Sequence, residues 1–366
     1  MDTSTLAKLY AIDGPFVTIY LATPSDTEQA ADKLETRWKN VVRDLSDAGV
    51  DAATIEAVTA ARGPHDRGNT RVLVAAHGTV HLAISLPQPP AQEIVTTGQL
   101  PRLVPALDAL TPQVPHVVVL ADRAGADILA YTAGPDPVET EQVQSDRWPV
   151  HKTGRGGWAT KRYDATVHNN WHDNAKDVAA TLEKIAADIS ARVIVAAGDT
   201  QALQLLEEQL PTQLRERYVS IPGGGRHLDG SEEIVAERIT EAVAEQAAKD
   251  TLTLLEEYAQ ERGQDDRATD GVEATIDALR KGQVATLILT DARDAARTAF
   301  FGPEPVHVAL TPEELLGLGV EQPWEAPLDE VLVRAALGTG ATVRFVGGGM
   351  KQAPTNGVGA LLRYAD

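Results

Sequence analysis

The stretch KTGRGGWATKRYDATVHNN, Lys152 to Asn170, decides how the rest of this sequence is interpreted. Three glycines lie within four positions, and glycine leaves the backbone mobile and free of Cβ atoms, so that it can approach another surface closely. The indole of Trp158 offers a face on which an unpaired base can stack. The basic side chains able to neutralise phosphates are Lys152, Arg155, Lys161 and Arg162. A loop of this composition is typical of an RNA contact, and a surface loop with incidental charge is the alternative.

This basic stretch stands in a strongly acidic chain. The 366 residues carry a net charge of −20, from 33 basic and 53 acidic side chains. Five of the basic residues and none of the acidic ones fall between Arg147 and Tyr163, which leaves 28 basic against 53 acidic residues elsewhere. A negative surface repels phosphate, so RNA contact is expected only at the few basic tips. The segment Ser231–Arg262, with nine acidic and three basic residues, is predicted to be a long helix with a solvated face.

Several classes of protein are excluded by the residues present. The chain has no cysteine, which rules out disulfides, thiolate metal sites and a cysteine nucleophile. The N-terminus has no basic region followed by an apolar run, so a signal peptide is not predicted. No apolar run is long enough to span a membrane, and we therefore predict a cytoplasmic protein. His168 and His172 are spaced for one helix face, but a third metal ligand is missing, and two polar helix residues are favoured over a zinc site. We therefore predict neither metal nor cofactor.

Periodicity predicts an α/β protein with mixed sheets and three domains, at residues 1–112, 113–262 and 263–366. The first combines a strand at 16–23, helices at 28–47 and 52–61, a hairpin that turns at His77-Gly78, and a short helix at 101–110. The second has two apolar strands within 116–134, a third strand at about 137–143, and then an amphipathic helix around 171–189, after which strands and helices alternate. The third begins after a polar linker at 262–270 and is predicted to form an α/β/α sandwich.

The central segment of the sequence resembles the signature of a known protein family. GRGGWATKRYDATVHNNWHDNAK, from Gly154 to Lys176, resembles the central-domain signature of the archaeal and eukaryotic class-one peptide-chain release factors. In that family a Gly-Arg-Gly-Gly-Gln-Ser loop precedes Arg-Arg-Phe and a helix that bears histidine or arginine. The family's Gly-Gly-Gln falls on Gly156, Gly157 and Trp158.

Two further matches follow in the same order along the chain. GVEATIDALRKGQVATLILTD, at 271–291, looks like the start of the family's third domain, and GVGALLRY, at 357–364, is similar to its closing Gly-Ile-Ala-Ala-Ile-Leu-Arg-Tyr. The resemblance implies a domain that reaches the decoding site, a ribonuclease-H-like central domain that reaches the peptidyl-transferase centre, and a third domain that contacts partner GTPases. It covers about the last two-thirds of the chain.

The departures from the family pattern bear on activity. In release factors the glutamine and its backbone N–H are implied to position water and stabilise the developing oxyanion. An indole cannot accept a hydrogen bond from water as a carboxamide does, and loss of one such stabilising group costs about 10²–10³ in rate. The first domain also lacks the Asn-Ile-Lys-Ser motif that reads stop codons. The sequence therefore predicts no catalytic residue and no termination activity.

The bacterial Balon family of ribosome hibernation factors is similar in domain plan and also departs from both motifs. This resemblance implies a monomer that occupies the A site of idle ribosomes with elongation factor Tu, touching rRNA and possibly tRNA. The finger residues Gly156, Gly157 and Trp158 are then predicted to pack on RNA. A peptidyl-tRNA esterase that rescues ribosomes, and an RNA- or tRNA-binding regulator unrelated to the A site, are the alternatives.

A second basic loop, ARGPHDRGNTR at 61–71, lies in the first domain. Because it is basic and joins a predicted helix to a predicted strand, it is the candidate for decoding-site contacts. The residues concerned are Arg62, His65, Arg67 and Arg71. An ordinary helix-to-strand connection is the alternative.

Overall fold

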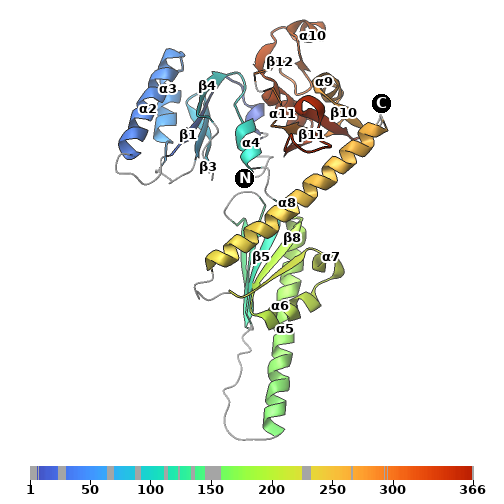
Figure 1. Ribbon diagram of the computed structural model, residues 1–366. Coiled ribbons are helices and arrows are strands. Elements are labelled where there is room, and N and C mark those ends of the chain that lie inside the picture. Colours follow the sequence, from blue (N-terminus) through green and yellow to red (C-terminus); the bar gives the residue numbers. More distant parts are fainter. Residues whose placement is uncertain are drawn as a thin grey trace. The chain divides into compact units, whose positions relative to one another are not determined.

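The computed structural model describes residues 6, 8–23, 30–63, 70–86, 92–110, 114–122, 124–132, 137–144, 158–224, 232–264, 267–291, 293–294 and 296–364, with the backbone alone for 30–31 and 158–171. The chain forms two compact units (Figure 1). The central unit is Pro112–Thr251, and the composite unit combines Asp2–Thr111 with Leu252–Asp366. The division into three domains stays a prediction.

The central unit is built on a five-stranded mixed sheet, in the order β7-β6-β5-β8-β9. The first three pair antiparallel and the last two extend the sheet in parallel. Its strands are β5 (His116–Ala121), β6 (Gly125–Tyr131), β7 (Glu139–Gln144), β8 (Val193–Gly198) and β9 (Tyr218–Pro222). This arrangement confirms the predicted mixed α/β class.

Helices cover both faces of the central sheet. On one face lie α5 (Trp158–Asp188) and α6 (Thr200–Gln209), whose leucines and isoleucines pack on alternate residues of β5 and β8. The predicted apolar stripe of α5 is buried, with Leu182 fully inaccessible. On the other face α8 (Glu232–Gly263) packs Ile239 and Val243 against Val193 and Val195. The short α7 (Thr212–Arg215) precedes β9. The layers are therefore helix, sheet, helix, because each sheet face is apolar and needs a cover.

The N-terminal part of the composite unit is an antiparallel sheet with the order β3-β2-β1-β4. Its strands are β1 (Phe16–Ala22), β2 (Thr70–Ala76), β3 (Thr79–Leu86) and β4 (Ile94–Gly98). Two helices cover one face, α2 (Ala30–Asp47) and α3 (Ala52–Ala60), and Trp38, Leu45 and Val58 fill the layer between them and the sheet. The 3-10 helix η1 (Lys8–Ala11) and helix α4 (Val104–Leu110) complete this part. Strands β2 and β3 turn at His77-Gly78, both with positive φ, as the sequence predicts for the hairpin.

The C-terminal part contains two sheets, one ordered β10-β16-β11-β15 and one ordered β13-β12-β14. Its strands are β10 (Ala268–Asp270), β11 (Val284–Thr290), β12 (Thr298–Phe301), β13 (Val308–Ala309), β14 (Trp324–Pro327), β15 (Thr342–Val346) and β16 (Val358–Leu362). Its helices are α9 (Val272–Arg280), α10 (Pro312–Gly317), α11 (Leu328–Gly338) and the 3-10 helix η2 (Thr355–Gly357). Helix α11 is buried on every side from Leu328 to Ala336.

The segment predicted as a polar linker, 262–270, is structured where it is described. Helix α8 continues to Gly263, and Ala268–Asp270 forms an edge strand antiparallel to β16. The reason lies in the last turns of α8, where Leu255 and Tyr258 are fully buried against Ile288 and Leu361. One continuous helix therefore belongs to both units, and the units divide within it at Thr251.

Candidate functional site

The basic finger, residues 152–162, is the first candidate site. Helix α5 begins at Trp158, earlier than the amphipathic stripe alone predicts. Ala159, Lys161 and Arg162 are good helix formers, and no glycine or proline lies between Trp158 and Asp188, which favours this early start. Of the predicted contact residues, Trp158, Lys161 and Arg162 lie on the first two turns of α5, where the backbone alone is described. The other four, Lys152, Arg155, Gly156 and Gly157, lie outside the described residues.

The position of the finger follows from how α5 is held. Among the described side chains of α5, which begin at His172, the first buried ones are Asn174 and Ala175, and the stripe continues through Leu182 and Ile185. At 1.5 Å per residue, Trp158 is about 25 Å along the helix from Ala175. Figure 1 shows the N-terminal half of α5 extending beyond the end of the central sheet. The start of α5 therefore lies away from the sheet, on a long helix whose C-terminal half is packed.

The start of α5 has its own electrostatics. The first N–H groups of a helix have no partner within the helix, and aligned peptide dipoles place about half a positive charge there. Because Trp158 is the first helical residue, its N–H belongs to this group. The two helical cations, Lys161 and Arg162, lie within the next turn. Such an end attracts phosphate or a developing oxyanion.

A small hollow lies where α5 and α6 meet the end of β5. It is lined by Ala121, Asp122, Gly125, Asn174, Ala175, Val178, Ala202, Leu205 and Leu206. Asp122 shapes one wall, because its carboxylate accepts the N–H groups of Ala124 and Gly125 at 2.7 and 2.9 Å. Asn174 is 8% exposed and is a polar residue within the apolar stripe of α5. Asn174 is not among the residues predicted from the sequence, although a lone asparagine beside Ala175 and Val178 on a helix is a recognisable feature.

The second candidate site is the loop between α3 and β2. Arg62 and Arg71 lie at its two ends, whereas His65 and Arg67 lie outside the described residues. Arg71 holds the loop in place, since its Nη2 donates to the Ala61 carbonyl at 2.9 Å. The exposed Arg62 pairs with Glu35 at 2.9 Å. Surface pairs of this kind contribute little to stability, so Arg62 can exchange Glu35 for a phosphate.

Within the described residues, no group of three or more His, Asp or Glu side chains is placed to hold a metal ion. His172 is partly buried on α5, and the side chain of His168 lies outside the described residues. Over the same part of the chain, no helix is long and apolar enough to cross a membrane.

The central unit is the part that a family model matches. Residues 115–264 match the family described as bacterial archaeo-eukaryotic release factor family 2. The matched range contains the sheet, the finger and α8. This part of the chain is release-factor-like.

Two curated relatives match along the whole chain. They are "Uncharacterized protein Rv2629" and "Uncharacterized protein MT2704", from two strains of Mycobacterium tuberculosis, H37Rv and CDC 1551. Each is 27% identical over 371 residues, which covers 100% of this chain and 97% of the relative. The sequence similarity to these relatives therefore extends along the whole of the given sequence.

Solved structures with similarity to this chain include release factors and Pelota proteins. The archaeal termination factor aRF1 aligns over 99% of this chain and 96% of its own, at 16% identity and a TM-score of 0.25. Archaeoglobus fulgidus Pelota aligns over 99% and 91%, at 13% identity and a TM-score of 0.36. An archaeal Pelota, from a model of ribosome-bound Pelota and ABCE1, aligns over 99% and 94%, at 13% identity and a TM-score of 0.41. TM-scores this low do not establish a shared overall arrangement.

Proposed function

We propose that this chain is a ribosome-binding translation factor that occupies the A site of idle ribosomes without hydrolysing peptidyl-tRNA. The observation that carries the proposal is the match of residues 115–264 to a release-factor family, in a segment where Trp158 stands at the family's glutamine position. The indole fills space and stacks, whereas it cannot replace a carboxamide in positioning water. The finger then acts as a plug on ribosomal RNA or on the 3′ end of tRNA.

The remaining parts of the chain receive roles in the same proposal. Residues 1–112 face the decoding site through the 61–71 loop, residues 113–262 reach the peptidyl-transferase centre, and residues 263–366 contact a partner GTPase. The partners are the rRNA of both subunits, with elongation factor Tu and tRNA as further partners in the manner of the Balon family. A monomer in the cytoplasm suits this role. One of the similar solved proteins is described as ribosome-bound.

The described geometry supports an end-on contact. Helix α5 places its first residue, Trp158, about 25 Å along the helix from the buried Ala175, which suits a narrow binding site. Away from the finger, exposed side chains of α8 such as Glu237, Glu241 and Glu245 present negative charge to solvent. Phosphate is attracted by the basic tip and repelled elsewhere, so the charges orient the protein on RNA and limit non-specific binding.

Ribosome co-sedimentation tests the plug. Arg155→Glu and Trp158→Ala are each expected to lower ribosome affinity by about tenfold or more, because one loses a phosphate contact and the other a stacking face. The matched control is Arg238→Glu, which makes the same charge change at an exposed position on α8. Unchanged binding by both finger variants, or an equal loss with Arg238→Glu, would remove the assigned role of the finger.

A second candidate function is hydrolysis of peptidyl-tRNA on stalled ribosomes. One specific feature favours it: the N–H of Trp158 lies at the start of α5, where it has no partner within the helix, and it survives any side-chain change. Backbone N–H groups at such a position stabilise a developing oxyanion.

Peptide release from ribosomes that carry peptidyl-tRNA and no stop codon separates the two functions. For the plug we expect release at the buffer rate, and no gain from Trp158→Ala. The esterase instead requires release above buffer that Gly157→Ala abolishes while ribosome binding persists. Binding to free tRNA as tight as binding to ribosomes would instead favour an RNA- or tRNA-binding regulator unrelated to the A site.

A further inference from the structure

Glu330 is the most deeply buried charged side chain among the described residues. It lies in the first turn of α11 and its exposed fraction is 0%. Acidic residues in the first turn of a helix are normally solvated, so the position alone gives no reason for burial. The question is what occupies the space around this carboxylate.

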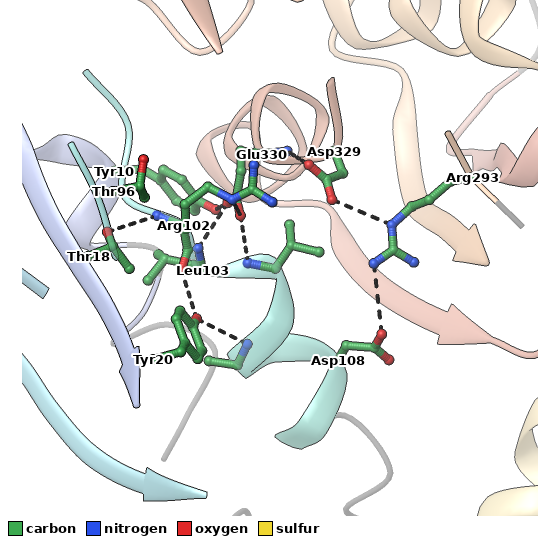
Figure 2. A network of polar contacts seen from close by, with 12 residues as sticks. Tyr10, Thr18, Tyr20, Thr96, Arg102, Leu103, Asp108, Arg293, Asp329 and Glu330 are labelled. Atoms are coloured by element: carbon green, nitrogen blue, oxygen red, sulfur yellow. Dashed lines mark hydrogen bonds and ion pairs between the residues drawn. The ribbon is translucent and has the colours of Figure 1, made fainter. Parts of the chain in front are cut away.

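Among the described residues, the polar groups that contact the Glu330 carboxylate come from the N-terminal part of the composite unit. Tyr10 of η1 donates its hydroxyl to Oε2 at 2.9 Å. The N–H of Leu103 donates to Oε2, and that of Val104 to Oε1, each at 3.0 Å. Nε of Arg102 lies 3.5 Å from Oε1. Figure 2 shows Glu330 reaching this set of donors from α11.

Two of these contacts cap a helix. Leu103 and Val104 are the residues at the start of α4, whose first N–H groups have no partner within that helix. Such groups usually bond to a side chain one to three residues away in sequence, whereas here the acceptor lies more than 200 residues further along the chain. Helix α4 is therefore properly capped only when the N-terminal and C-terminal parts are docked.

The charges around Glu330 are unbalanced. The groups that face it are Tyr10 from η1, Tyr20 from β1, Arg102 from the segment before α4, and Asp329 from α11 itself. Asp329 has its own cation, Arg293, at 3.5 Å, and Arg293 also lies 3.8 Å from Asp108 of α4. Arg334 of α11 donates to the carbonyls of Gly302 and Pro303. This leaves Arg102, at 3.5 Å, as the cation that offsets a fully desolvated carboxylate beside a second one.

We propose that Glu330 is a proton-dependent clasp, which fastens the N-terminal part of the composite unit to α11 when protonated and loosens when ionised. When Glu330 is protonated, its carboxyl O–H has an acceptor within reach, because the Tyr10 hydroxyl can accept a hydrogen bond as well as donate one. Its carbonyl oxygen still caps α4. The clasp stands on contacts within one unit and does not depend on the proposed function.

The direction of the pH dependence follows from the surroundings. Burial, followed by the charge of Asp329, raises the pKa of Glu330 to about 7, against the lowering influence of Arg102 and the two backbone donors. A carboxyl group with a raised pKa in the docked form contributes stability that is full below its ordinary pKa and is lost as the pH rises through about 7. Between about pH 6 and pH 8 the undocking equilibrium of the wild type is expected to increase roughly tenfold.

The test is hydrogen exchange of the α4 amides in the full chain, corrected for the intrinsic effect of pH on exchange. The wild type should open about tenfold more at about pH 8 than at about pH 6, and Glu330→Gln, which cannot ionise, should show no such change. Glu261→Gln is the matched control, a buried glutamate of the composite unit that pairs with Arg267, and it should behave as the wild type.

A second variant keeps the proposal testable if Glu330→Gln fails to fold. Arg102→Gln removes the offsetting cation, so the loosening should move to higher pH. Retention of the full pH change in Glu330→Gln, a pH-independent wild type, or a move to lower pH in Arg102→Gln would overturn the clasp.

Discussion

Gly198→Ala is expected to destabilise the central unit by about 3 kcal/mol or more. Gly198 ends β8, and a Cβ at this position would lie 1.8 Å from the carbonyl oxygen of Ala121 in the neighbouring β5. That oxygen cannot move freely, because it accepts the N–H of Asp199 at 3.2 Å. The φ of Gly198 is also +145°, which side chains rarely allow. Chemical unfolding of the full chain, followed by far-UV circular dichroism, measures the loss.

Gly223→Ala is the matched control for this prediction. Gly223 also has a positive φ, +98°, and its N–H donates to the Gly198 carbonyl, but nothing lies within 4 Å of the added Cβ. Only backbone strain remains there, about 1 kcal/mol. Equal losses in the two variants would show that the overlap with Ala121 is relieved by movement.

The central sheet and the packed half of α5 were predictable because their apolar pattern is strong. Val178, Leu182 and Ile185 recur at helical spacing, and all three are buried as predicted. The apolar residues that alternate along β5 and β8 form the sheet face on which these three side chains pack. The class of the fold therefore follows from periodicity alone.

Other elements carry too little local signal. Strands β12 and β14 have four residues each, and they become strands by pairing within the sheet β13-β12-β14, where β12 lies between the other two. The start of α5 at Trp158 does not follow from the sequence, because the glycines that directly precede it favour a loop and the apolar stripe begins further along the chain. At the candidate site, Arg62 and Arg71 were found from their charge, but charge could not distinguish an exposed, exchangeable arginine from one that holds its own loop.

Glu330 and Asp270 show a further limit of sequence reasoning. Both are acidic residues next to helix starts, where solvent exposure is the ordinary expectation. Their partners lie up to 320 residues away for Glu330 and 85 for Asp270, so no local pattern reveals them. Only tertiary packing identifies such carboxylates as structural.

Asp270→Ala is expected to destabilise the composite unit by about 2 to 4 kcal/mol, since it leaves several donors without their acceptor. Asp270 accepts the Tyr258 hydroxyl at 3.0 Å and both the N–H and hydroxyl of Thr355, at 2.7 and 2.8 Å. It also pairs with Arg262 at 3.3 Å. The same substitution at Asp277, an exposed residue that pairs with Arg280 on α9, should cost under about 0.5 kcal/mol. Urea unfolding of the full chain compares the two variants.

The pH dependence of Asp270 has the opposite sign to that of Glu330. Burial is the largest single influence and raises the pKa of Asp270, but the donors from Thr355, Tyr258 and Arg262 together outweigh it, so the pKa is lowered. A carboxylate with a lowered pKa contributes stability above its ordinary pKa and loses it as the pH falls below that value. Below about pH 4, the free energy of unfolding should therefore fall less with decreasing pH in Asp270→Ala than in the wild type, which is a smaller acid limb of the stability profile. The loosening near pH 7 should remain. If instead the acid limb is unchanged, Asp270 does not hold the end of α8 onto β10 by its charge.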